Sequence, residues 1–379
     1  MKSIKANNMQ LSPEEFARYS RHLSLPEIGI KGQKKLKGSS VLCIGCGGLG
    51  SPVLIYLAAA GIGNLGIVDN DLVEESNLQR QIIHTHKSIG KSKIESARSR
   101  IIDINPYCKV TIFSELLNNE NALEIIKPYD LVCDCTDNFE SRYLINDACV
   151  LLGKPYIYGA ISKFEGQASV FNLDKDSPNF RDLIPQPPSM DLLPSCSESG
   201  VIGVLPGIIG LIQATEIIKI IAGIGTTLSG RILIFNALEM KFKELKLKKD
   251  YAAKPITELI DYKDFCGSSG VTKVEDSIKS ISAKKLRVLL EDNPNKNILL
   301  DVRTEEEFKL NAIKGSILVP LKNIQNGQEI DKIRKLASNK NIFVHCKTGK
   351  RSRKAILSLR SNGIDAVNLE GGINSWNES

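Results

Sequence analysis

The sequence has no long unbroken apolar run and few aromatic residues, which make up 6% of the chain. Its most apolar stretch, residues 201–224, is interrupted by a proline and by charges at Glu216 and Lys219. We therefore expect a buried helix there and no membrane span. Residues 1–10 carry charge but no apolar core, so we also expect no secretory signal peptide.

Long blocks of like charge are absent as well. The 50 Lys and Arg residues against 43 Asp and Glu leave a net charge of +7, spread along the chain and without a basic patch interleaved with aromatic residues. This distribution argues against direct nucleic-acid binding and is compatible with an acidic protein partner. With 42% hydrophobic and 25% charged residues, the composition excludes disordered, collagenous and coiled-coil proteins, and 379 residues suffice for two or three domains.

The nine cysteines form an odd number in a chain without a recognisable secretory signal. This favours reduced thiols and a cytoplasmic location over a disulfide framework. Cys43, Cys133, Cys135 and Cys149 lie within apolar segments and are expected to be core residues. One or two of the other thiols are expected to be reactive.

The order of the predicted elements indicates an α/β protein with two domains. From Ser39 the pattern runs strand, Gly-rich turn, helix and strand, and helical periods at 92–104 and 139–152 flank a further apolar strand. This alternation is typical of a Rossmann-like, doubly wound and mostly parallel sheet. The expected division is a first domain at 1–250, a Lys- and Ser-rich linker at 251–280, and a second, smaller α/β domain at 281–379. In the second domain, a capping box at Thr304–Glu307 predicts the start of a helix.

A glycine-rich turn follows the first strand and opens a helix. Its glycines, Gly45, Gly47, Gly48 and Gly50, let a phosphate approach the backbone, while the helix N-terminus supplies oriented N–H groups. Asp69, at the end of the next strand, is placed to accept hydrogen bonds from a ribose. These features alone predict a nucleotide site, for which a nicotinamide-dependent dehydrogenase is the default alternative.

Polar segments downstream of the turn indicate a triphosphate rather than a dinucleotide. Hydroxyl, amide and guanidinium groups follow Asp69, a lysine begins the next helix, and a CTDN segment ends the strand across the switch point of the sheet. Two cations and a carboxylate fit the charge that develops on a leaving pyrophosphate with its Mg²⁺ ion. The candidate residues are Ser76, Asn77, Leu78, Gln79, Arg80, Lys93, Asp137 and Asn138.

The motifs GCGGLG, SNLQRQ and CTDN, in this order over about residues 18–248, resemble the MoeB/ThiF adenylyltransferases, bacterial relatives of ubiquitin-activating enzymes. The resemblance implies ATP-dependent adenylation of the C-terminal Gly-Gly carboxylate of a ubiquitin-like sulfur carrier protein. The site residues that it implies are Gly48 for ATP, Asp69 for the ribose, Asn77, Arg80 and Lys93 for the phosphates, and Asp137 for Mg²⁺ through ATP.

An N-terminal helix carries a further candidate residue. A capping box at Ser12–Glu15 predicts a helix that places Arg18 and Arg21 on one face. Arg21 matches an arginine that, in the family, reaches the active site of the neighbouring subunit. The resemblance therefore implies a homodimer in which Arg21 is catalytic; the alternative is an ordinary surface charge.

The zinc site of this family is where the sequence departs from its relatives. They have two CxxC pairs, and the corresponding positions here are Asn179 and Asp182, then Lys263 and Cys266. One thiol cannot form a tetrahedral structural zinc site, so we predict that the chain binds no zinc. Without zinc, the linker must be anchored by packing. The lack of the zinc cysteines is a feature that the chain shares with the metal-free, rhodanese-fused MoeZ-like subgroup, which it resembles.

Cys196 lies in a proline-rich segment, where some relatives have a thiol that takes part in acyl or disulfide exchange. No base flanks this cysteine, and a helix start near Gly200 offers only modest activation of the thiol. The alternative is an inert loop cysteine.

A second reactive segment, HCKTGKRS, follows a buried strand of the C-terminal domain. Successive N–H groups in such a loop form an anion-binding nest that stabilises a thiolate or persulfide at Cys346, reinforced by Arg351. The C-x4-R spacing resembles single-domain rhodaneses, whereas phosphatases have one residue more. The segments Asp301–Arg303 and Gly371–Trp376 complete the resemblance over residues 280–379. A buried structural cysteine is the alternative.

The two sites combine into one hypothetical reaction sequence. ATP activates the terminal glycine of the carrier, and a persulfide at Cys346, charged by thiosulfate or a cysteine desulfurase, attacks the acyl-adenylate. Cys196 then cleaves the acyl-disulfide to release a thiocarboxylate. Molybdopterin, thiamin, cysteine and tRNA-thiolation pathways all remain open. The rivals are carrier activation for protein conjugation, a nicotinamide-dependent oxidoreductase, and a dimeric scaffold without turnover.

Overall fold

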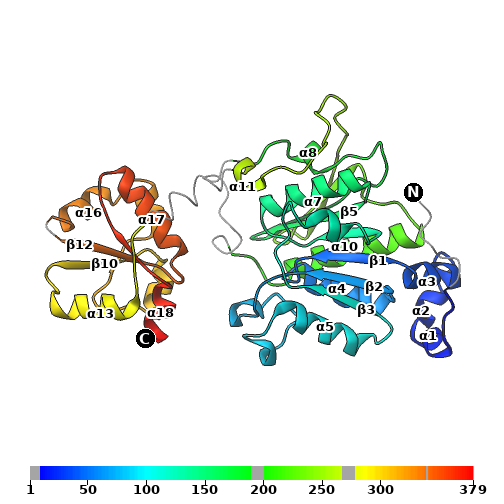
Figure 1. Cartoon of the computed structure of the whole chain (residues 1–379), viewed down its shortest axis with the longest axis horizontal. Helices are drawn as coiled ribbons and strands as arrows, with labels where there is room; N and C mark the ends of the chain where they lie inside the picture. The colour runs from blue at the N-terminus through cyan, green and yellow to red at the C-terminus, as the bar shows by residue number, and fades with distance from the viewer. Residues whose placement is uncertain (1–8, 189–199, 267–277, 339, 379) are drawn as a thin grey trace. The chain divides into compact units, whose positions relative to one another are not determined.

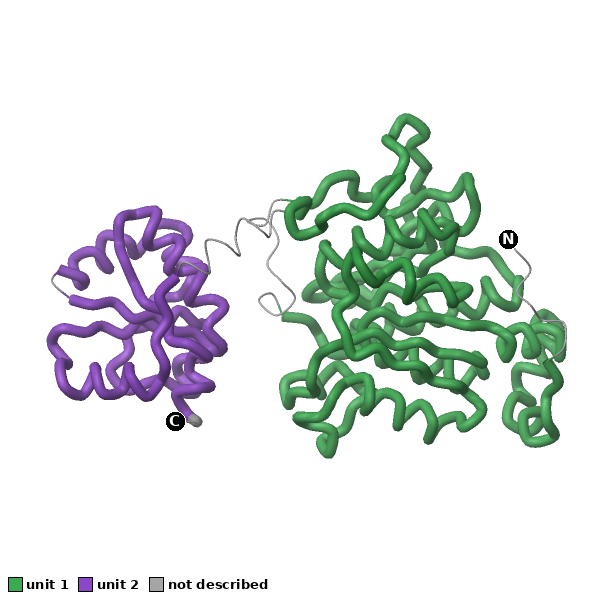
Figure 2. Tube along the Cα trace, viewed as in Figure 1, with its two compact units in different colours: residues 1–267 green, residues 268–379 purple. Residues whose placement is uncertain are grey.

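The computed structural model describes residues 9–188, 200–266, 278–338 and 340–378. The chain forms two compact units, Met1–Gly267 and Ser268–Ser379, and each has its own sheet (Figure 1, Figure 2). The first unit extends past the boundary expected at residue 250, because apolar side chains between Leu259 and Cys266 pack on its core. Part of the segment expected as linker therefore belongs to the first unit.

An eight-stranded sheet forms the centre of the first unit. Its strands are β1 (Ser40–Ile44), β2 (Asn64–Val68), β3 (Lys109–Phe113), β4 (Leu131–Asp134), β5 (Tyr156–Ser162), β6 (Glu165–Phe171), β7 (Arg231–Asn236) and β8 (Lys241–Lys246). They lie in the order β3-β2-β1-β4-β5-β6-β7-β8, parallel as far as β5 and antiparallel beyond it. The chain reverses its direction of strand addition between β1 and β4, which is the switch point of a doubly wound sheet.

Helices cover both faces of this sheet. On one face α4 (Gly50–Ala60) packs against α5 (Lys93–Ile104) and α10 (Leu205–Ala222). On the other face α7 (Phe139–Leu152) packs against the three helices α6 (Ala122–Ile126), α8 (Phe180–Leu183) and α11 (Tyr262–Phe265). The remaining helices of this unit include α1 (Pro13–Arg18), α2 (Ser20–Leu23) and α3 (Gly29–Lys37).

Within the described part of the chain, α10 is the one helix long and apolar enough to cross a membrane. It is 61% buried and contacts α4, β5 and β6. The polar residues that interrupt its apolar run form hydrogen bonds within the first unit. Gln213 Nε2 donates a 2.8 Å hydrogen bond to the carbonyl of Asp134, and Glu216 accepts one of 2.8 Å from the N–H of Leu228. These contacts identify α10 as a core helix, as the sequence indicated.

The expected N-terminal helix is divided in two. The capping box of Ser12 and Glu15 is present at the start of α1, but this helix ends at Arg18. Tyr19 is only 4% exposed, and its hydroxyl accepts a 2.8 Å hydrogen bond from Asn105. Because Tyr19 turns into the core, Arg18 and Arg21 lie on separate helices and not on one face of a single helix.

The second unit contains a parallel five-stranded sheet in the order β11-β10-β12-β13-β9. The strands are β9 (Ser280–Ile281), β10 (Asn297–Asp301), β11 (Ile317–Leu318), β12 (Asn341–His345) and β13 (Val367–Leu369). One face packs against α13 (Ala283–Asp292) and α18 (Gly372–Glu378), and the other against α15 (Leu321–Gln325), α16 (Ile330–Leu336) and α17 (Lys350–Ser361). The short α14 (Glu305–Leu310) begins with the predicted capping box of Thr304 and Glu307.

Candidate functional site

The glycine-rich turn connects β1 to α4. Gly45 has φ of +92°, a left-handed conformation that favours glycine, and its N–H donates a 2.8 Å hydrogen bond to Val68. A Cβ atom on Gly50 would lie 2.2 Å from the carbonyl oxygen of Gly45, so the turn can close this tightly only with glycine there. Leu49, the N-cap of α4, provides no side-chain cap. In the first turn, the N–H of Ser51 donates a 3.0 Å hydrogen bond to the carbonyl of Gly47, and Pro52 has no N–H to donate.

A cavity of about 230 Å³ lies where β1 and β4 end, at the switch point of the sheet. Open α/β sheets bind their ligands at this position. The structure brings most of the predicted nucleotide residues to this cavity, although they come from five separate segments. The predicted residues that line it are Gly45, Gly47, Gly48, Asp69, Arg80, Lys93, Asp137 and Asn138.

Two carboxylates hold Lys93 at the wall of the cavity. Its Nζ lies 2.7 Å from Asp71 Oδ2, and its side chain is 8% exposed. Burial disfavours the charged form, but the charges of Asp69 and Asp71 outweigh this and raise the pKa of Lys93. Asp69 also accepts 2.9 Å hydrogen bonds from the N–H groups of Cys46 and Asp71. One carboxylate thus fixes the glycine-rich turn while helping to keep a cation beside it.

The segment before Arg80 shapes the site without lining the cavity. Asn77, in the 3-10 turn η1 (Glu75–Asn77), accepts a 3.2 Å hydrogen bond from the N–H of Glu74. The Ser76 carbonyl accepts one of 2.9 Å from Arg80. Gly50 likewise supports the turn from within α4. Gly50, Ser76, Asn77, Leu78 and Gln79 do not line the cavity, and the ligand contacts of all the predicted residues stay predictions.

Arg142 is a cavity residue that the sequence analysis missed. It is 8% exposed, its Nη2 donates a 3.1 Å hydrogen bond to the carbonyl of Thr136, and its guanidinium lies 5.4 Å from the Tyr158 ring centroid. Its position could have been found, because Arg142 lies one helical turn after Asn138, the N-cap of α7. The cavity therefore has three cations, from Arg80, Lys93 and Arg142.

A buried acid lies beneath this third cation. Asp134 Oδ1 accepts hydrogen bonds from the N–H and hydroxyl of Thr136, at 2.9 and 2.7 Å. Its Oδ2 is buried and has no hydrogen-bond partner among the described residues. Burial raises the pKa of Asp134, while the charge of Arg142 opposes this.

Arg21 is exposed on α2 and is not among the residues that line the cavity of its own chain. Arg18, by contrast, is used internally, since its Nη1 donates a 2.8 Å hydrogen bond to the carbonyl of Ile104. The role of Arg21 in a neighbouring subunit stays a prediction. Cys196 lies outside the described residues.

The positions of the relatives' zinc ligands have other roles here. Asn179 and Asp182 form the capping box of α8, with a 2.7 Å hydrogen bond from the N–H of Asn179 to Asp182. Burial raises the pKa of the Cys266 thiol to about 11. Across residues 9–188, 200–266, 278–338 and 340–378, no group of three or more His, Cys, Asp or Glu side chains is arranged to hold a metal ion. The residues at these positions therefore do not fit a zinc site.

In the second unit, Cys346 follows β12 and precedes α17. Its Sγ is almost completely buried and accepts a 3.1 Å hydrogen bond from the N–H of Gly349; the Ser352 hydroxyl lies 3.6 Å away. Gly349 has φ of +94°, which turns the loop so that its N–H points back at the sulfur. One N–H of the loop thus points at the sulfur, and the full anion-binding nest for a thiolate or persulfide stays a prediction.

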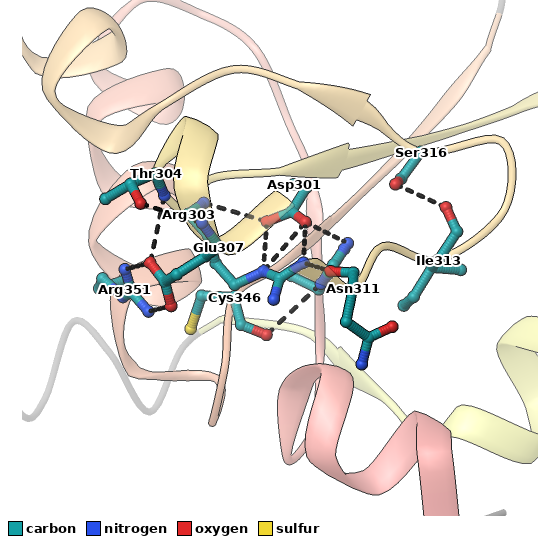
Figure 3. A network of polar contacts seen from close by, with 10 residues as sticks. Asp301, Arg303, Thr304, Glu307, Asn311, Ile313, Ser316, Cys346 and Arg351 are labelled. Atoms are coloured by element: carbon teal, nitrogen blue, oxygen red, sulfur yellow. Dashed lines mark hydrogen bonds and ion pairs between the residues drawn. The ribbon is translucent and has the colours of Figure 1, made fainter. Parts of the chain in front are cut away.

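Arg351 does not lie open to the loop. Its two terminal nitrogens contact the two carboxylate oxygens of Glu307 at 2.6 and 2.7 Å (Figure 3). A second arginine nearby, Arg303, is buried and paired with Asp301 at 2.6 Å. Glu307 was predicted as part of a capping box but not as a site residue, because its contact with Arg351 spans 44 positions.

The first unit has a cation-lined cavity at the switch point of its sheet, and the second has a buried cysteine whose sulfur accepts a hydrogen bond from a loop N–H. These features define an enzyme that joins nucleotide chemistry to sulfur chemistry. Residues 19–255 match the model of the ThiF family, and residues 282–379 match the Rhodanese-like domain. The chain belongs to the ThiF family and has a C-terminal rhodanese-like domain.

Relatives with both parts span the whole chain. One is the probable adenylyltransferase/sulfurtransferase MoeZ of Mycobacterium tuberculosis, 47% identical over 373 residues, or 97% of this chain and 94% of the relative. A second, the adenylyltransferase and sulfurtransferase MOCS3 of Drosophila grimshawi, is 41% identical over 98% of this chain and 86% of its own length. A third, the probable molybdopterin-synthase adenylyltransferase of Porphyra purpurea, is 42% identical over 99% of this chain and 96% of its own length.

Among solved structures, E. coli MccB with MccA-N7isoASN has a TM-score of 0.57 at 21% identity, covering 69% of this chain and 76% of that one. This likeness shows a shared fold and nothing more. The family and its relatives make this chain an adenylyltransferase and sulfurtransferase enzyme, and they set aside the oxidoreductase and the scaffold alternatives.

Proposed function

We propose that the enzyme adenylates the C-terminal Gly-Gly carboxylate of a ubiquitin-like sulfur carrier protein and converts it to a thiocarboxylate with sulfur from Cys346. The observation that carries this proposal is the presence, in one chain, of a three-cation cavity at a switch point and a buried cysteine sulfur that accepts a backbone N–H. The name of the relative from Porphyra purpurea supports molybdenum cofactor biosynthesis among the open pathways.

In the adenylation step, a carboxylate oxygen of the carrier attacks the α-phosphorus of ATP and pyrophosphate leaves. Asp69 is assigned to the ribose and Gly48 to the nucleotide, since both line the cavity. The phosphates are assigned to Asn77, Arg80 and Lys93, together with the glycine-rich turn before α4. Asp137, exposed at the cavity, is the carboxylate that fits Mg²⁺ held through ATP, and the ion supplies charge neutralisation on the leaving pyrophosphate.

In the transfer step, the terminal sulfur of a Cys346 persulfide attacks the acyl carbon, and AMP leaves. The product is an acyl-disulfide between the carrier and Cys346. The Cys196 thiolate then attacks the Cys346 sulfur, and the carrier departs as a thiocarboxylate. A Cys346–Cys196 disulfide remains, which an external thiol reduces.

The assembly and location are part of the same proposal. An exposed Arg21 supports a homodimer in which this residue reaches the partner's cavity. The eight described cysteines are all free, which supports a reducing, cytoplasmic setting. We further propose that the enzyme works without zinc.

The test combines the full chain with a candidate carrier, ATP, Mg²⁺ and a sulfur donor, and it measures pyrophosphate release and the intact mass of the carrier. We expect Cys346→Ala to keep pyrophosphate release but to lose thiocarboxylate, and Lys93→Ala to lose both. Lys91→Ala, an exposed lysine nearby, is the matched control. No carrier-dependent pyrophosphate release by the wild-type enzyme would overturn the adenylation step. Carrier transfer to other proteins that persists in Cys346→Ala would favour the conjugation alternative.

A further inference from the structure

We propose that Glu307 determines the class of sulfur donor, disfavouring small oxyanions such as thiosulfate and favouring donors that carry a persulfide on a thiol. This inference rests on the proposed sulfur-transfer function of Cys346 and names the donor of that same site.

Both carboxylate oxygens of Glu307 accept hydrogen bonds from the guanidinium of Arg351 (Figure 3). An oxyanion ligand would bind an arginine in this same bidentate geometry. Both side chains are mostly buried, with 29% of Glu307 and 23% of Arg351 exposed. The capping box of α14 also fixes Glu307, whose N–H donates to the Thr304 hydroxyl and whose Oε2 accepts from the N–H of Thr304. The carboxylate is therefore held in place from two directions.

The pair is ionised at neutral pH. Hydrogen bonding to Arg351 lowers the pKa of the Glu307 carboxyl, and the same bond raises the pKa of the Arg351 guanidinium. Arg351 and Cys346 also interact electrostatically, and Figure 3 shows both in the same polar network. An incoming dianion would meet a cation that is already neutralised.

Arg303, the second arginine drawn with Cys346 in Figure 3, cannot take over this role. It is buried, binds Asp301 through both carboxylate oxygens, and is further tied to the Asn311 carbonyl. Lys347 and Lys350 are exposed on the loop, and as solvated point charges they attract anions without matching the planar fork of an arginine. The exposed part of the loop is thus basic, while the guanidinium of Arg351 is already paired with Glu307.

The two classes of sulfur donor differ in the leaving group that they release when Cys346 takes up the sulfur. In both cases the Cys346 thiolate attacks the outer sulfur of the donor, the donor S–S bond breaks, and Cys346 becomes a persulfide without any further oxidant or reductant. Thiosulfate releases sulfite, whose two charges need an open cationic fork. A persulfide donor releases a thiolate with one charge, which needs no such fork.

The test measures formation of the Cys346 persulfide in the full chain by intact mass and rate, with thiosulfate and with glutathione persulfide as probes. We expect the wild-type enzyme to prefer glutathione persulfide in kcat/KM by about tenfold or more. Glu307→Gln should free Arg351 and shift the donor ratio toward thiosulfate by about tenfold, mainly through KM for thiosulfate. Glu305→Gln, exposed on the same helical turn, should leave the ratio unchanged.

Two results would overturn the inference: equal use of both donors by the wild-type enzyme, or a donor ratio that Glu307→Gln does not move. If that variant fails to fold, Glu307→Asp withdraws the carboxylate from Arg351 and should shift the ratio in the same direction. Failure of both donors to place sulfur on Cys346 would instead reject the sulfur-transfer function itself.

Discussion

The hydroxyl of Tyr262 donates a 2.8 Å hydrogen bond to the Asp147 carboxylate, 115 positions away in the chain. The same carboxylate, 1% exposed, accepts two hydrogen bonds from Arg181 at 2.9 and 2.7 Å. Asp147 on α7 thus joins α8 to α11, in the region where relatives are expected to hold zinc. Aromatic rings of Tyr143 and Phe265 at 5.1 Å complete the contact. A polar and aromatic cluster anchors the chain here, as expected for a linker held by packing.

Removing the Tyr262 hydroxyl should destabilise the first unit. We expect Tyr262→Phe to lower its free energy of unfolding by about 1.5–3 kcal/mol, because a largely buried carboxylate loses one of its donors. Thermal and denaturant unfolding of the full chain measure this effect. Tyr251→Phe is the matched control, since Tyr251 is 76% exposed. An equal change in both variants would argue that the hydrogen bond to Asp147 contributes nothing.

Chelation should leave the enzyme intact. Because Asn179 and Asp182 cap a helix and Cys266 is a single buried thiol, we expect 1,10-phenanthroline to leave the melting temperature unchanged. Metal analysis of the purified protein should find no stoichiometric zinc. Bound zinc whose removal lowers the melting temperature would contradict the prediction of a metal-free enzyme.

Arg142 should contribute to nucleotide chemistry. We expect Arg142→Gln to lower kcat/KM for carrier-dependent pyrophosphate release by about 10²-fold, because a preorganised cation is lost from the cavity wall. Arg98→Gln, half-exposed on α5, should leave this rate unchanged. The melting temperature separates a catalytic loss from a folding defect, and an unaffected rate would show that Arg142 is structural.

Acid should weaken the second unit through His345. Burial is the largest cause that lowers the pKa of this imidazole below the ordinary value of 6.5. A group with a lowered folded-state pKa binds fewer protons in the folded than in the unfolded state. The stability it contributes is therefore complete above about pH 6.5 and is lost as the pH falls toward the folded-state pKa.

The measurement is the melting temperature of the second unit between pH 7.5 and 5.5, where we expect a decrease of a few degrees. His345→Asn should flatten this dependence, since asparagine does not titrate. An unchanged slope in the variant would show that another group carries the acid sensitivity.

Much of the fold followed from local patterns. The capping boxes at Ser12 and Thr304, the helix over 139–152 and the strand–turn–helix at Gly45 all depend on residues within a few positions of one another. Cys346 and Gly349 are also close in sequence, so the sulfur-binding loop was recognisable from its spacing alone. Local geometry and turn chemistry are sufficient for features of this kind.

Other features required the folded chain. The predicted helix through Arg18 and Arg21 breaks because Tyr19 turns inward toward Asn105, 86 positions away. Ser76 and Asn77 bind their own segment and do not line the cavity. The side chain of Asn77 accepts from the N–H of Glu74, and the hydroxyl of Ser76 donates to the carboxylate of Glu74.

The sequence by itself determined the two α/β units, the glycine-rich turn, the cations at 80 and 93 and the reactive loop at Cys346. The tertiary structure alone decided that Glu307 binds Arg351 and that Asp147 binds Tyr262. The physical reason is that these contacts join polar and charged side chains on separate elements. Their pairing follows from sheet order and helix packing, which no periodicity in the sequence encodes.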